Sequence, residues 1–141
     1  MKKGFTLIEL IIVIAVISIL IGIALPRFRG MQDAGYIAQA KGELRTLQTA
    51  VESYYIHNNE TLPATYADLE GDTPNIIGTT APTDPFNSGS DYGAAINGDY
   101  YVIYSVGPAG NGSCAISATG VVTETNNPIY VTNGTPRDSS P

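Results

Sequence analysis

The first 25 residues constrain the fold of this chain more than any other stretch does. The run Phe5–Leu25 is apolar apart from two hydroxyl side chains, one glycine and a single carboxylate, Glu9. As an α-helix this run would be about 31 Å long, which matches the hydrocarbon thickness of a bilayer. An ionised side chain in such a helix costs about 2.5–3.5 kcal/mol on insertion scales, so Glu9 requires a partner from outside the chain.

A short basic leader, Lys2-Lys3-Gly4, precedes the apolar run. Basic residues ahead of such a run are typical of secretory signals, but no small-x-small cleavage site follows it here. Pro26-Arg27-Phe28-Arg29 follows instead, and the small residue, Gly4, lies before the run. The segment therefore does not have the form of an ordinary secretory signal.

The stretch Gly4-Phe5-Thr6-Leu7-Ile8-Glu9-Leu10 resembles the N-terminal motif of the type IV pilin-like family, in which a short basic leader ends in Gly ahead of F-T-L-I-E-L. With the helix behind it, the resemblance covers about the first third of the chain. It implies that residues 1–4 are a leader, that a prepilin peptidase cuts between Gly4 and Phe5, and that the new Phe5 amine is methylated. It also implies that Glu9 meets the N-terminal amine of a neighbouring subunit in a helical filament. The alternative is a single-span anchor in which snorkelling makes Glu9 tolerable.

Charge is divided unevenly along the chain. Residues 1–29 hold four basic side chains and one carboxylate, whereas residues 30–141 hold three basic side chains and twelve carboxylates. By the positive-inside tendency Lys2 and Lys3 stay in the cytoplasm, which places the C-terminal part outside. Arg27 and Arg29 then reach the outer headgroups by snorkelling. The acidic outer part argues against broad nucleic-acid binding.

Two residues near the end of the hydrophobic segment 5–29 weaken its helix. Pro26 lacks an N–H and disfavours helix at Leu25, and Gly22 lowers local helix stability, so we expect a kink or a melted segment between them. In the family this stretch is where the helix loosens when subunits leave the bilayer, and the resemblance implies that role for Gly22 and Pro26. The alternative is a proline kink without a mechanical role.

Residues 30–141 suffice for one small soluble domain. The chain has 15 glycines, nine prolines and only 14% charged residues, which favours a loop-rich domain over a helical bundle. Apolar residues recur at spacings of three and four from residue 37, at Ile37, Ala40, Leu44, Leu47, Val51 and Tyr54. This stripe predicts an amphipathic helix over about residues 30–57, which needs another element to pack on.

The helix is expected to end near Asn58 and Asn59, because Asn tolerates the left-handed conformation and Pro63 follows. Thr65 with Asp68 three residues later predicts the N-cap of one or two further helical turns. Residues 58–98 are otherwise expected to be a connector, and from Gly71 onward it is rich in Gly, Pro, Thr, Asn and Asp.

Strand signals fall within about residues 99–132. Tyr100–Val106 is rich in aromatic and β-branched residues, and Thr119-Gly120 reads as a hairpin turn between Cys114–Ala118 and Val121–Thr125. Ile129–Thr132 adds a fourth strand, and residues 133–141 are expected to form a mobile tail. The predicted fold class is therefore α+β. A long N-terminal helix, half membrane-spanning and half amphipathic, packs on a small antiparallel β-sheet of three to four strands.

The sequence offers little for catalysis. His57 is the only histidine and has no nucleophile motif near it, and no phosphate-binding loop, dinucleotide fingerprint or zinc-ligand spacing occurs. Cys114 is the only cysteine, so no disulfide forms within the chain, and we expect a buried strand residue rather than a reactive thiol. We therefore expect no enzymatic activity.

The region from Asp84 to Gly110 resembles the calcium-bearing C-terminal region of major pseudopilins, in which an Asp-Pro-aromatic turn precedes a strand and a Gly-x-Asp-Gly loop follows. The turn is present as Asp84-Pro85-Phe86, but Pro108-Ala109 stands where the family's loop offers a carboxylate. The resemblance leaves Asp91 and Asp99 as calcium ligands. The alternative is that both are solvated acids in turns and that the chain has no cofactor.

Three sequons, beginning at Asn59, Asn111 and Asn133, are candidate acceptors for N-glycans in an exported chain. Such short motifs also arise by chance in a sequence rich in Asn, Thr, Ser and Gly.

The function expected from the resemblance is that of a structural subunit of a type IV pilus-like filament. Its partners would be copies of itself, the prepilin peptidase, an inner-membrane assembly machinery and, before assembly, the inner membrane. An extracellular pilus is the preferred location. The alternative within the class is a major pseudopilin, which forms a periplasmic piston in type II secretion. The alternative outside it is a monomeric, membrane-anchored binding module.

Overall fold

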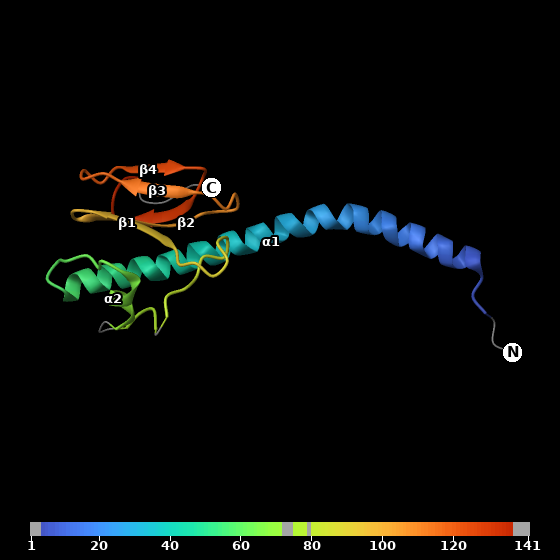
Figure 1. Ribbon diagram of the computed structural model, residues 1–141, viewed down its shortest axis with the longest axis horizontal. Helices are drawn as coiled ribbons and strands as arrows, with labels where there is room; N and C mark the ends of the chain where they lie inside the picture. The colour runs from blue at the N-terminus through green and yellow to red at the C-terminus, as the bar shows by residue number, and fades with distance from the viewer. Residues whose placement is uncertain (1–3, 72–74, 79, 137–141) are drawn as a thin grey trace. The chain divides into compact units, whose positions relative to one another are not determined.

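The computed structural model of the chain describes residues 4–71, 75–78 and 80–136, without the side chain of Pro26 (Figure 1). The structure divides into two compact units, of which one ends at Gly35 and the other begins at Tyr36. The first helix, α1 (Leu7–His57), contributes residues to both units.

In the first unit the chain is helical from Leu7 to Gly35, with the backbone of Gly22 and Pro26 included. The large apolar side chains from Phe5 to Met31 are mostly exposed. By length and composition, α1 contains a stretch of mean hydropathy 3.0 that is able to cross a membrane. The helix is not interrupted between Gly22 and Pro26 in this state, and its loosening during assembly stays a prediction.

The second unit has three layers (Figure 1). The middle layer is an antiparallel sheet in the order β1 (Gly93–Asn97), β2 (Tyr100–Ser105) and β5 (Ile129–Thr132). The C-terminal part of α1 covers one face of this sheet, and the antiparallel hairpin of β3 (Ser113–Ile116) and β4 (Val122–Thr125) covers the other. This arrangement confirms the predicted α+β class.

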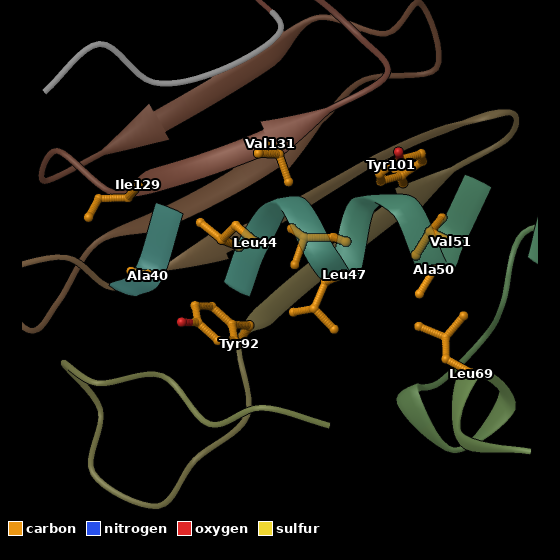
Figure 2. Packing of buried hydrophobic residues seen from close by; sticks show 11 residues of the cluster. Ala40, Leu44, Leu47, Ala50, Val51, Leu69, Tyr92, Tyr101, Ile129 and Val131 are labelled. Atoms are coloured by element: carbon orange, nitrogen blue, oxygen red, sulfur yellow. The ribbon is translucent and has the colours of Figure 1, made fainter. Parts of the chain in front are cut away.

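The core between helix and sheet is built from the predicted stripe of α1. Ala40, Leu44, Leu47 and Val51 are buried against alternate residues of the sheet (Figure 2). Ile37 and Tyr54 are partly buried and pack against this cluster. The sheet supplies Tyr101, Ile103, Ile129 and Val131 to this side. Since α1 here has one apolar face, burial of that face on the sheet stabilises both elements.

The middle strand β2 is buried on both faces. Tyr101 and Ile103 point toward α1, whereas Val102 packs with Cys114, Ile116 and Val122 of the β3–β4 hairpin. A strand buried on both faces reads as a continuous apolar run rather than an alternating one, which explains the run Tyr100–Tyr104. The hairpin turn predicted at Thr119-Gly120 is present, and Gly120 has the positive φ of +78° that such a turn favours in glycine.

Helix α2 (Tyr66–Glu70) confirms the short helix predicted after Thr65. The Asp68 carboxylate accepts hydrogen bonds from the Thr65 backbone N–H at 2.8 Å and from the Thr65 hydroxyl at 3.2 Å.

The structure differs from the expected organisation in three places. Strand β1 lies within the stretch expected to be an irregular connector, because its pairing with β2 and not its composition makes it a strand. The strands form a three-stranded sheet and a separate two-stranded one rather than a single sheet.

The third difference concerns the expected tail. Its first residues are packed: the Asn133 side chain bonds to the backbone of Tyr101 and Asp99, and Thr135 bridges Val121. Residues 137–141 lie outside the described part of the chain.

Candidate functional site

The peptide bond between Gly4 and Phe5 precedes the helix. Gly4, Phe5 and Thr6 are not helical, and the Phe5 side chain is 86% exposed. A bond in a non-helical, exposed segment has the form that a peptidase requires, since proteolysis concentrates where the backbone is not held by secondary structure.

Glu9 closes the first turn of α1 together with Thr6. The Glu9 Oε2 atom accepts hydrogen bonds from the Thr6 backbone N–H at 2.9 Å and from the Thr6 hydroxyl at 2.7 Å. The Glu9 N–H in turn donates to the Thr6 hydroxyl oxygen at 3.3 Å. This is a capping box, in which the residue before the helix and the third helical residue satisfy each other's polar groups. The pattern Thr6-x-x-Glu9 is the sequence signal for it, of the same kind as Thr65-x-x-Asp68.

The capping box leaves one oxygen of Glu9 available. Among the described residues no group bonds to Oε1, because both bonds from Thr6 end on Oε2. Large apolar side chains surround the carboxylate on the helix surface, and Ile8 and Leu10 beside it are 66% and 59% exposed. The segment therefore presents an acceptor on an apolar surface, which suits a cationic partner group that is itself withdrawn from water.

Two further carboxylates of α1 act within the domain, and sequence reasoning missed both. Glu43 Oε2 accepts a 2.6 Å hydrogen bond from the Tyr92 hydroxyl, and Glu52 Oε1 accepts one of 2.6 Å from the Tyr101 hydroxyl. Burial and, next, the hydrogen bond to glutamate raise the pKa of both tyrosines. The Tyr101 bond joins α1 to β2, and the Tyr92 bond joins it to the residue just before β1.

Asp84 is a third carboxylate whose role the sequence did not reveal. It is 2% exposed and accepts hydrogen bonds from the Ser105 hydroxyl and the Val106 N–H at 2.8 Å, and from the Phe86 N–H at 2.9 Å. These bonds fix the turn before β1 against the end of β2. The Asp-Pro-aromatic turn is thus a buried structural junction in this chain.

The structure does not bring the two predicted calcium ligands together. Asp91 precedes β1 and Asp99 lies in the turn after it, so the five residues of the strand separate them. At about 3.3 Å per residue, such a separation exceeds the diameter of any calcium coordination sphere. Among the described residues no group of three or more His, Cys, Asp or Glu side chains is placed to hold a metal ion. Asp91 and Asp99 therefore do not fit one shared calcium site.

The three sequons differ in their surroundings. Asn111 is exposed in the turn before β3, and Asn59 is exposed with a positive φ of +53°. The Asn133 amide nitrogen, to which a glycan would attach, donates a 2.7 Å hydrogen bond to the Asp99 carbonyl. Asn133 is exposed as well, but its amide nitrogen is already engaged in a bond within the fold.

Cys114 is a buried strand residue, as expected from the sequence. Burial, together with the nearby charge of Glu124, raises the pKa of its thiol to about 12. The thiol is therefore protonated at neutral pH and a poor nucleophile.

The N-terminal segment matches a known family of sequences. The model of the family described as "Prokaryotic N-terminal methylation motif" matches residues 1–25. The chain is 38% identical over 82 residues to a fimbrial protein of Pseudomonas aeruginosa, a match that covers 58% of this chain and 51% of that protein. It is 47% identical over 54 residues to the type IV major pilin protein PilA of Myxococcus xanthus, covering 38% of this chain and 24% of the relative.

A relative from a secretion system also matches. The chain is 28% identical over 81 residues to the type II secretion system core protein G of Pseudomonas aeruginosa, covering 57% of this chain and 56% of the relative. The chain spans about half the length of the fimbrial protein that it matches, and no solved structure matches it significantly. Together the matches support the resemblance to the type IV pilin-like family and a pilin-type subunit.

Proposed function

We propose that this chain, as a pilin-type subunit, polymerises into a type IV pilus-like helical filament after its leader is removed. The observation that carries the proposal is an exposed apolar helix with one carboxylate, Glu9, whose Oε1 atom accepts no hydrogen bond from the described residues. Burying the Phe5–Leu25 surface against equivalent helices removes it from water once it has left the bilayer. The names of the relatives are those of pilins and a secretion pseudopilin rather than enzymes.

In this proposal a prepilin peptidase cuts the Gly4–Phe5 bond, and the Phe5 amine that is released is methylated. The amine of one subunit then pairs with Glu9 of its neighbour. A wrong axial stagger would leave the carboxylate buried without a cation, which costs about 3–5 kcal/mol, so the pair selects one register. Before assembly the subunit is held in the inner membrane, where an assembly machinery collects it.

A second candidate is a major pseudopilin that forms a periplasmic filament in type II secretion. The match to the secretion core protein G supports this candidate. It covers a similar share of this chain as the match to the fimbrial protein does. Both candidates use the same assembly chemistry and differ in where the filament ends. The monomeric, membrane-anchored binding module differs from both, because it would not need the Glu9 pairing.

The decisive experiment replaces Glu9 and follows filaments and membrane protein separately. In Glu9→Ala we expect at least a tenfold loss of filaments in sheared surface material or in the periplasm, seen by electron microscopy, with the subunit still present in the membrane. Glu9→Gln keeps the shape and an acceptor but not the charge, and should also assemble poorly. Ser18→Ala is the matched control, because the Ser18 hydroxyl already donates to the Ile14 carbonyl of its own helix at 2.7 Å. Normal filaments from Glu9→Ala would refute the pairing, and filaments found only in the periplasm would favour the pseudopilin.

A further inference from the structure

The two edges of the central sheet differ in how far they are covered. Strand β5 is buried at all four positions, whereas β1 has three exposed positions, Ala94, Ile96 and Asn97. Among the described residues no backbone hydrogen bond reaches the outer side of β1 between Gly93 and Asn97. The edge is closed only at its start, where Asp91 pairs with Thr83 in an isolated bridge.

The register of the hairpin identifies the free backbone groups. Asn97 pairs with Tyr100 across a two-residue turn whose first residue, Gly98, has a φ of +61°. In a hairpin of this kind the residues that flank the turn form a hydrogen-bonded pair, and every second pair follows. The N–H and C=O groups of Ala94 and Ile96 therefore point outward. Strand β1 contains no charged residue and no proline, which are the usual means of blocking a sheet edge.

An apolar cavity lies beside this edge. Its volume is about 110 Å³, and residues of β1, β2, α2 and the segment before α2 line it, among them Pro63, Tyr66, Ala94, Ile96 and Ile103. Ala94 and Ile96 belong to the sheet face that α1 covers, since they pair with Ile103 and Tyr101 of that face. They stay exposed there and border the cavity.

The charges at the β1 edge favour a basic partner segment over a second copy of β1. Asp91 and Asp99 are exposed at the two ends of β1. If β1 of a second copy paired antiparallel through Ala94 and Ile96, the register would set Asp91 of each copy opposite Asp99 of the other. Like charges directly opposite each other are destabilising, so self-pairing is disfavoured and a basic partner is favoured. The net charge of −9 on residues 30–141 acts in the same direction.

We propose that the β1 edge binds an extended segment of another polypeptide, which adds a fourth strand to the β1–β2–β5 sheet. The segment carries apolar side chains at alternate positions, which enter the cavity between Pro63 and Ile96. It carries Lys or Arg near both ends, opposite Asp91 and Asp99. Backbone hydrogen bonds to Ala94 and Ile96 supply affinity, and the cavity and the two carboxylates supply selectivity. This binding is independent of filament assembly through Glu9.

The test uses the full chain in non-ionic detergent and the capped peptide Lys-Thr-Thr-Val-Thr-Val-Thr-Thr-Lys, whose two valines face Ala94 and Ile96. We expect a dissociation constant of about 0.1–1 mM by fluorescence anisotropy, with amide NMR shifts confined to β1 and its neighbours. The same peptide N-methylated at both valines loses the hydrogen bonds to the edge and should not bind. With glutamates in place of the lysines, binding should fall at least tenfold.

A matched pair of protein variants completes the test. Ala94→Lys places a cation at the edge and should lower binding of the lysine peptide at least tenfold. Ala115→Lys adds the same charge at an exposed position of β3 and should leave binding within about twofold. Equal binding of the N-methylated peptide, equal binding of the glutamate peptide, or no binding at 5 mM would each overturn the proposal. If Ala94→Lys does not fold by circular dichroism, the three peptides alone decide the outcome.

Discussion

The two units of this chain use the same residue types in opposite ways. Leu20 in the first unit is 61% exposed, whereas Leu44 in the second unit is fully buried, although both belong to α1. The first unit therefore has no core of its own, and its apolar surface requires lipid or other copies of the chain. The second unit buries its stripe against its own sheet. The two parts of α1 therefore differ in environment, because the second unit includes a sheet that covers the apolar stripe.

Polar groups follow the same division. In the first unit the bonds of the Glu9 carboxylate to described residues stay within its own helix turn, at Thr6. In the second unit Glu43 and Glu52 bond to tyrosines 49 residues away in the sequence. Glu43 and Glu52 thus hold the fold of the second unit, whereas among the described residues the Oε1 atom of Glu9 accepts no hydrogen bond.

The largest difference between the two units is expected in the free energy of unfolding when a leucine is replaced by alanine. Leu44→Ala should lower the free energy of unfolding by about 2–5 kcal/mol, because it leaves a cavity in the core. Leu20→Ala should change it by less than about 0.5 kcal/mol, because the Leu20 side chain is 61% exposed. All nine tyrosines lie from residue 36 onward, so tyrosine fluorescence during urea titration in detergent reports the second unit. Comparable losses in both variants would mean that the units do not fold separately.

The next effect concerns glycines. A Cβ atom at Gly134 would collide with the Gly120 carbonyl oxygen, whereas a Cβ at Gly42 meets nothing within 4 Å. Gly134→Ala should therefore destabilise the second unit by about 1–3 kcal/mol. Gly42→Ala should stabilise it by up to about 1 kcal/mol, because alanine is the better helix former. The same urea titration measures both, and a stable Gly134→Ala protein would contradict the close packing of the segment after β5.

The smallest effect is expected from one hydroxyl group. Tyr101→Phe removes the bond to Glu52 and should cost about 1 kcal/mol near neutral pH. Burial, then the bond to Glu52, raises the pKa of Tyr101, so its contribution is complete below about pH 10, the value of an unfolded tyrosine, and is lost as the pH rises further.

The stability difference between wild type and Tyr101→Phe should accordingly shrink between pH 9 and pH 11. Urea titrations at five pH values measure it, with Tyr36→Phe as the control, since Tyr36 is 45% exposed and should cost less than about 0.5 kcal/mol. A difference that grows with pH would show that the Glu52 bond does not favour the neutral phenol.

Sequence patterns predicted the elements that have a strong apolar periodicity or a characteristic turn residue. The spacing from Ala40 to Val51 predicted the buried face of α1, and the β-branched run of β2 and the glycine turn at Gly120 predicted two strands and a hairpin. Strand β1 was missed because Gly-Ala-Ala-Ile-Asn has weak strand propensity. Its position depends on β2, and Gly93 is required there because the Tyr104 ring lies where a side chain would start.

The candidate site residues and the residues that join α1 to the rest of the domain also differ in how far the sequence revealed them. Gly4, Phe5 and Glu9 were accessible to sequence reasoning because their motif is continuous in the chain. Glu43 and Glu52 lie off the apolar stripe and so resemble solvated residues until the fold brings Tyr92 and Tyr101 to them. Asp91 and Asp99 lie at opposite ends of β1, a separation that their proximity in the sequence did not reveal.

The two phenol–carboxylate bonds have a mechanical consequence. Glu43 and Glu52 are nine residues apart, so their attachment points lie about 13 Å apart along α1. A pulling force along the helix axis would slide α1 past the sheet rather than peel it away. Both hydrogen bonds and the contacts of Leu44, Leu47 and Val51 between them would then carry the load at the same time. Contacts loaded in shear fail together, so the domain should resist tension along its helix far better than tension across it.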